Sequence, residues 1–141
     1  MITVIFTWAL LPVCVSALAG LPAGGAKAIT DYAGLVEHLR GAGFAPRFEE
    51  IVEQPFFSVK GKVLAIGDEH LQVFEYPTPE AASAEAARIS PDGMTVGTTK
   101  VHWLGPPHFY RSGKLLVLYL GTDKGLRRAL ESALGLQFAG Q

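Results

Sequence analysis

The stretch Lys114-Leu-Leu-Val-Leu-Tyr-Leu120 decides the fold. From Leu115 to Leu120 every side chain is apolar or aromatic, so both faces of an extended chain would be apolar here. Strands of this kind are buried on both faces, whereas a strand with one solvated face alternates apolar and polar residues. We therefore expect Leu115 to Leu120 to form a central strand of a sheet, lying under helices.

The residues on either side of this strand predict a hairpin and a helix. Ser112-Gly113 is typical of a turn, and the short run His108-Phe109-Tyr110 before it supplies a second strand. After the central strand, Thr122 or Asp123 can cap a helix, because a side-chain oxygen satisfies the first free N–H groups. This helix places three leucines on one face and ends at a glycine (Leu126, Leu130, Leu134 and Gly135).

The same order of elements occurs earlier in the chain, at an offset of 44 residues. Residues 62–66 and 70–76 flank a Gly-Asp turn and predict a hairpin. Thr78-Pro79-Glu80 then opens a helix, with threonine as the N-cap and proline in the first turn. Residues 70–76 align with residues 114–120, and Thr78 aligns with Thr122. The chain therefore contains two strand–turn–strand–helix units that are related in pattern.

The remaining elements complete the predicted architecture. A helix over residues 30–42, capped by Thr30 or Asp31, precedes the two units. Residues 47–60 predict one or two short strands broken at Pro55, and residues 98–104 predict another strand. The predicted fold is α+β: an N-terminal helix followed by two ββα units, which form one antiparallel sheet with helices packed on one face. Residues 29–141 are expected to be a single extracytoplasmic domain.

Residues 1–28 are expected to be a signal peptide or a membrane anchor. The run from Ile2 to Ala19 is almost wholly apolar, and every acidic residue lies at or after Asp31. An apolar run followed by small residues is typical of an export signal. Cleavage after Ala19 or after Ala28 fits the sequence, and so does an uncleaved anchor. We therefore expect the protein to be exported, secreted or anchored through residues 2–19.

Composition excludes several classes of protein. The chain has 12 basic and 13 acidic residues, a net charge of −1, which argues against nucleic-acid binding. Cys14 is the single cysteine, so neither an intramolecular disulfide nor a multi-cysteine metal site is expected. A cleaved signal would take Cys14 with it, and the residues before it fit a lipidation motif poorly. No common catalytic motif is present, so we expect no enzymatic activity and no cofactor.

From about Asp31 to its end, the chain resembles a family of small uncharacterised bacterial envelope proteins that are often predicted lipoproteins. The resemblance rests on motifs spread along the chain, namely EQPFFSV (residues 53–59), LQVFEY (71–76), ISPDG (89–93), PPHFY (106–110) and LQFAG (136–140). It implies export and residence in the cell envelope, and it implies no particular activity. The chain departs from this pattern at the lipidation motif.

The aromatic residues beside the two proline breaks are the candidate binding site. If both breaks lie at one end of the sheet, these side chains could line a groove for an unidentified envelope protein or peptide. The candidate residues are Phe56, Phe57, Trp103, His108, Phe109 and Tyr110. The alternative is that these aromatic side chains complete the core.

The sequence supports four further interpretations. A small apolar ligand could be carried between the sheet and the helices. Alternatively, His102 and His108 could share a metal ion in a metal-dependent enzyme, although their spacing matches no known template. The acidic residues Glu49, Glu50 and Glu53 predict a solvated strand edge that is protected against self-pairing. An exposed edge strand could also recruit an extended segment of a partner by β-augmentation.

Overall fold

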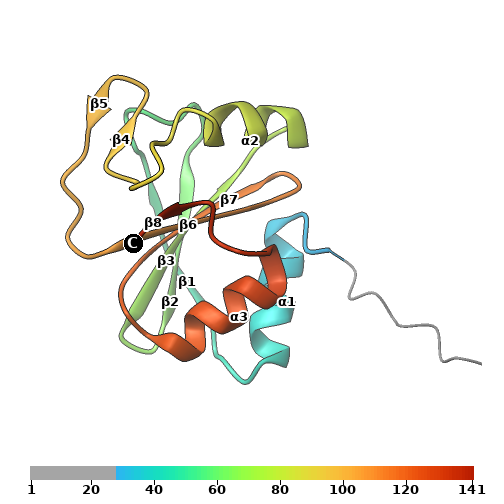
Figure 1. Cartoon of the computed structure of the whole chain (residues 1–141). Helices are drawn as coiled ribbons and strands as arrows, with labels where there is room; N and C mark the ends of the chain where they lie inside the picture. The colour runs from blue at the N-terminus through green and yellow to red at the C-terminus, as the bar shows by residue number, and fades with distance from the viewer. Residues whose placement is uncertain (1–27) are drawn as a thin grey trace, which may run out of the picture.

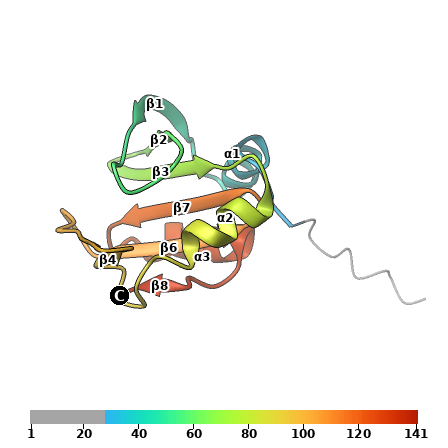
Figure 2. The ribbon, with the colours of Figure 1, turned by 90° about the horizontal axis from the view of Figure 1, so that it is seen from above.

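In the computed structural model, which describes residues 28–141, this part of the chain forms a six-stranded antiparallel sheet with three helices (Figure 1). Figure 2 follows the strands in their spatial order, β1-β2-β3-β7-β6-β8. The class is α+β. The helices are α1 (Tyr32–Gly41), α2 (Pro79–Ala86) and α3 (Lys124–Leu134). The strands of the sheet are β1 (Arg47–Val52), β2 (Gly61–Ile66), β3 (Glu69–Glu75), β6 (Pro107–Ser112), β7 (Leu115–Leu120) and β8 (Ala139–Gly140).

The predicted leader, including Cys14 and the possible cleavage site after Ala19, lies outside the described residues. Within residues 28–141, none of the helices is long and apolar enough to cross a membrane. A separate two-stranded ribbon joins β4 (Thr95–Val96) to β5 (Thr99–Lys100).

β7 is the central strand, as its sequence predicts. It pairs with β3 on one side and with β6 on the other. Its residues from Leu115 to Tyr119 are at most 1% exposed. Side chains alternate between the faces of a strand, so Leu115, Val117 and Tyr119 enter one core cluster and Leu116 and Leu118 enter a second.

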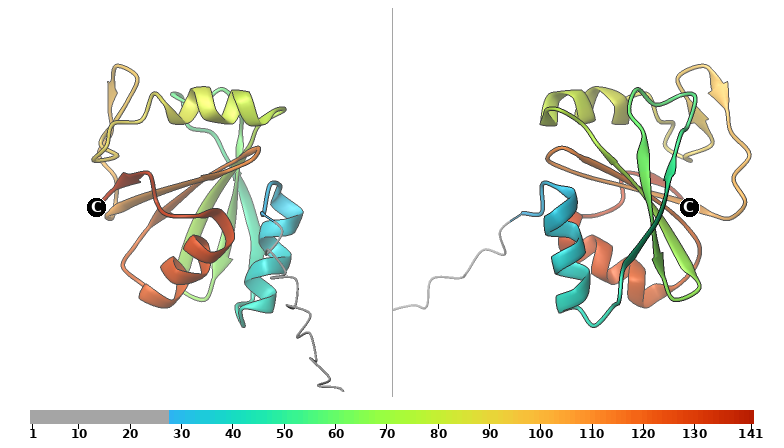
Figure 3. Two further views of the ribbon diagram at one scale, coloured as in Figure 1. Left: turned by 45° about the vertical axis from the view of Figure 1, so that its right-hand side comes forward. Right: turned by 180° about the vertical axis from the view of Figure 1, so that it is seen from behind.

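The prediction that the helices share one face of the sheet is wrong. The leucines of α1 and α3 belong to the core cluster that contains Val117, whereas Ala82 and Ala86 of α2 belong to the cluster that contains Leu118. Figure 3 shows α2 on one side of the sheet and α1 with α3 on the other. The physical reason is that β7 is apolar on both faces, so each face needs its own cover.

Three short segments also differ from the sequence-based expectations. Of residues 98–104, only Thr99–Lys100 form a strand. In the loop that follows, the indole Nε1 of Trp103 donates to the carbonyl oxygen of Gly93 (2.7 Å). Residues 55–59 form a turn. The two-residue strand β8 was not predicted, and it depends on Gly140, where a Cβ atom would overlap the carbonyl oxygen of Pro107.

The predicted helix caps are confirmed, and the structure shows which of the two candidate residues caps α1 and α3. The side chain of Asp31, rather than Thr30, accepts from the backbone N–H of Gly34 at the start of α1. Thr78 caps α2, and Asp123, rather than Thr122, caps α3. Gly135 follows the end of α3 with a positive φ of 89°.

Enlarging the face of α2 that meets the sheet tests this two-sided packing. Ala82 is fully buried against the sheet, whereas Ala84 of the same helix is exposed. We expect Ala82→Leu to lower the free energy of unfolding by about 1–3 kcal/mol, because added volume in a filled core forces strain. Ala84→Leu is the matched control and should change it by less than about 0.5 kcal/mol. Urea unfolding measures both, and equal effects would contradict the position of α2.

Candidate functional site

The structure brings the two proline-containing segments together at one end of the sheet. The ring centroids of Phe56 and Trp103 lie 5.8 Å apart, and those of Trp103 and Phe109 lie 5.9 Å apart. Phe57 packs against Phe56 at 4.9 Å. Phe57 and Phe109 are buried, whereas Phe56 and Trp103 are half-buried. These four rings therefore lie mainly in the core, and two of them reach the surface.

His108 and Tyr110 do not join this group, although the sequence suggested one shared groove. They alternate with Phe109 along β6, so they point to the opposite face of the sheet. His108 is 2% exposed, with Nδ1 2.8 Å from Oε1 of Gln137 and Nε2 2.8 Å from the carbonyl oxygen of Gly121. Tyr110 is fully buried. The six candidate residues therefore do not line one surface.

His102 and His108 differ in their surroundings. His102 is exposed on the loop before β6, whereas both ring nitrogens of His108 face acceptors inside the protein. Among residues 28–141, His, Cys, Asp and Glu side chains do not gather in any group of three or more that could hold a metal ion.

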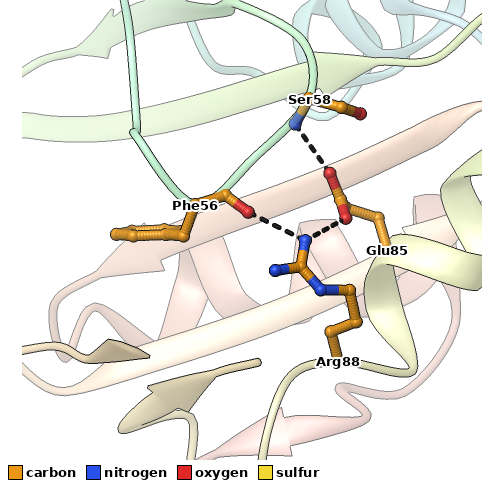
Figure 4. Close-up of polar contacts among 4 residues, drawn as sticks. All are labelled: Phe56, Ser58, Glu85 and Arg88. Carbon is orange, nitrogen blue, oxygen red and sulfur yellow. Dashed lines mark hydrogen bonds and ion pairs between the residues drawn. The ribbon is translucent and has the colours of Figure 1, made fainter. Parts of the chain in front are cut away.

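An ion pair between the buried Glu85 and the half-exposed Arg88 holds the loop that carries Phe56 against α2 (Figure 4). The backbone N–H of Ser58 donates to Oε1 of Glu85 (2.7 Å), and Nη1 of Arg88 donates to Oε2 of the same carboxylate (2.7 Å). The same Nη1 donates to the carbonyl oxygen of Phe56 (3.0 Å). Burial alone would raise the pKa of Glu85, but these hydrogen bonds outweigh it and leave the pKa below its usual value.

The most exposed apolar surface within the sheet lies on its edge strand, β1. Phe48 is 53% exposed and Ile51 is 51% exposed. A bulge between Phe48 and Glu50 brings Phe48 opposite Leu64 and Ile51 opposite Lys62 of β2. Because Leu64 and Lys62 are two residues apart, they share a face, and the bulge therefore turns both Phe48 and Ile51 toward α1.

A surface groove of about 330 Å³ lies between α1 and β1, next to these side chains. The side chains that line the groove are largely apolar. On the same face of the sheet, Nζ of Lys62 lies over the ring of Tyr32, 4.1 Å from its centroid. The sequence did not single out this groove, because Phe48 and Val36 read as ordinary core residues. The side chains that form it include Tyr32, Val36, Arg40, Pro46, Phe48 and Leu64.

The acidic residues in and directly after β1 are solvated, as predicted. Glu49, Glu50 and Glu53 are all exposed. Glu49 pairs with Nε2 of His70 at 3.2 Å, and Glu53 pairs with Nζ of Lys60. Exposed pairs of this kind contribute little to stability, so the three carboxylates mainly set the charge of this edge.

Comparisons with known proteins found no protein-family model, no curated protein and no solved structure that matches this chain significantly.

Removing one charge tests the link between α2 and the loop of Phe56. We expect Glu85→Gln to lower the free energy of unfolding by about 1.5–3 kcal/mol, the usual contribution of hydrogen bonds to a charged group. Glu80→Gln makes the same chemical change at an exposed position of the same helix and should cost less than about 1 kcal/mol. Thermal and urea unfolding measure the loss of stability in both variants. An equal decrease in the free energy of unfolding of the two variants would refute the role of Glu85.

The buried tyrosines predict how stability depends on alkaline pH. Burial, and next the hydrogen bond from Tyr119 to Glu69, raise the pKa of Tyr119 to about 12. Burial also raises the pKa of Tyr76 and of Tyr110. An unfolded tyrosine ionises near pH 10, so above that value the unfolded chain loses protons before the folded chain does.

The free energy of unfolding should therefore be insensitive to these groups below about pH 10. Above that pH it should fall, by up to about 1.4 kcal/mol per pH unit for each tyrosine. Urea unfolding across this range measures the slope, and Tyr119→Phe should make it shallower. A slope that Tyr119→Phe leaves unchanged would contradict this account.

Proposed function

We propose that this protein is a non-catalytic binding protein that takes an extended segment of a partner protein along β1. The observation that carries the proposal is an edge strand of six residues with two half-exposed apolar side chains, Phe48 and Ile51, of which Phe48 lines an adjoining groove. Edge strands with exposed apolar side chains are sites where another chain can pair.

β-Augmentation fits the geometry of this edge. Among residues 28–141, β1 pairs with β2 alone, so its outer side has no neighbouring strand. Backbone hydrogen bonds along that side would supply much of the affinity, and pockets for alternate side chains would supply specificity. The groove beside Tyr32, Val36 and Phe48 is placed to receive one apolar side chain of the added segment.

The charges of β1 favour a basic partner over a second copy of this chain. Glu49 and Glu50 lie on the strand itself, and Glu53 follows it. Arg47 is the one basic residue of β1, so acidic residues outnumber basic ones along this edge. Two copies paired edge to edge would bring these carboxylates together, and like charges on facing strands are destabilising. A segment in which lysine or arginine alternates with apolar residues would instead meet opposite charge.

We place this activity outside the cytoplasm. The proposal rests on the apolar run from Ile2 to Ala19 and on the resemblance to bacterial envelope proteins. Among residues 28–141, the exposed apolar side chains and the open strand edge are features that favour binding.

Two peptides test the proposed function with the full-length chain. In one peptide lysine alternates with valine, and in the other glutamate replaces every lysine. We expect the basic peptide to bind by titration calorimetry, and to slow amide hydrogen exchange in Arg47–Val52, while the acidic peptide binds at least about tenfold more weakly.

Variants locate the binding surface. Phe48→Ser should weaken binding of the basic peptide about tenfold, because burial of one large apolar side chain contributes about 1.5–3 kcal/mol. Leu136→Ser, which removes an even more exposed apolar side chain outside β1, should leave the affinity unchanged. Equal binding of the two peptides, or equal losses in the two variants, would refute the proposal.

A further inference from the structure

The α2 side of the sheet carries a groove that α2 does not cover. α2 contacts β6 and β7, whereas the groove lies toward β2 and β3. Val63, Gln72 and Leu118 face one another across β2, β3 and β7, and they form the floor together with Leu120. The volume of the groove is about 290 Å³, close to the lower limit of known small-molecule sites.

Leu104 stands beside this floor and is 103% exposed, the most exposed large apolar side chain among the described residues. Its loop is held on both sides. Before it, the indole of Trp103 donates to the carbonyl oxygen of Gly93. After it, the backbone N–H of Gly121 donates to the carbonyl oxygen of Pro106 (3.3 Å). A single exposed leucine is ordinary, but one held next to an apolar floor offers a ligand a second apolar wall.

One end of the groove is acidic. Asp68 and Glu69 line it at the turn between β2 and β3, and no lysine or arginine is among its lining residues. Oε2 of Glu69 accepts a hydrogen bond from the hydroxyl of Tyr119 (2.7 Å), whose side chain lies in the core cluster on the other face of the sheet, so Asp68 supplies the carboxylate at this end of the groove. His70 also lines the groove, and it faces Glu49. The charge of this end is therefore complementary to a cation.

We propose that this groove binds a small amphiphile with an apolar body and an ammonium group. The apolar body lies between Leu104 and the floor formed by Val63, Leu118 and Leu120, and the ammonium group lies at Asp68. This inference does not rest on the proposed peptide site, because Phe48 and Ile51 face the other side of the sheet.

Two probes of equal chain length test the proposal with the full-length protein. n-Octylammonium carries the expected charge and octanoate carries the opposite charge. Below their micellar concentrations, we expect octylammonium to shift the NMR signals of Val63, Leu104 and Leu118, and to bind at least about tenfold more tightly than octanoate. Equal or tighter binding of octanoate, or no shift in these three residues, would overturn the proposal.

Variants with matched controls test which side chain binds the apolar body of the ligand and which binds its ammonium group. Leu104→Ser should weaken octylammonium binding about tenfold, whereas Leu136→Ser should leave it unchanged. Asp68→Asn should reduce the preference for octylammonium over octanoate, whereas Glu80→Gln on α2 should preserve it. Because Leu104 and Asp68 are exposed, both variants should keep the thermal stability of the wild type. If each variant behaved like its control, the assignment of this groove would be wrong.

Discussion

The burial of β7 on both faces is the constraint on which the rest of the structure depends. A strand that is apolar on both sides needs a strand neighbour at each edge and a cover over each face. β3 and β6 supply the neighbours, α1 and α3 cover one face, and α2 covers the other. The helices that cover the sheet are centred on β7. β1 lies three positions from β7 in the sheet, beyond the centre of this cover. Both proposed binding surfaces lie where this cover ends.

Polar contacts inside the loops decide which surfaces are rigid. Glu85 joins α2 to the loop that contains Phe56, and the indole of Trp103 joins the loop that contains Leu104 to Gly93. A surface that is already ordered loses less conformational entropy on binding than a mobile one. The same loops place aromatic side chains over the end of the sheet, so part of the candidate site first inferred from the sequence serves as core.

Sequence patterns predicted the elements well and their placement on the sheet less well. The apolar run at Leu115–Leu120 and the caps at Thr78 and Asp123 were sufficient, because strand burial and helix capping are local effects. The face occupied by α2 was missed because its small residues define no strong apolar stripe, although two-sided burial of β7 already required cover on both faces. The alternation along β6 likewise separates His108 and Tyr110 from Phe109. Phe48 and Leu104 look like core residues in the sequence, and only tertiary structure shows that they are exposed.

Native-state hydrogen exchange tests the central claim most directly, since it measures the opening free energy of each strand. If β7 is the centre of the structure and β1 is a lightly held edge, the amides of β7 should exchange only through global unfolding. The amides of β1 that bond to β2 should exchange through local opening at a clearly lower free energy. Equal protection of β1 and β7, or earlier opening of β7, would contradict this account.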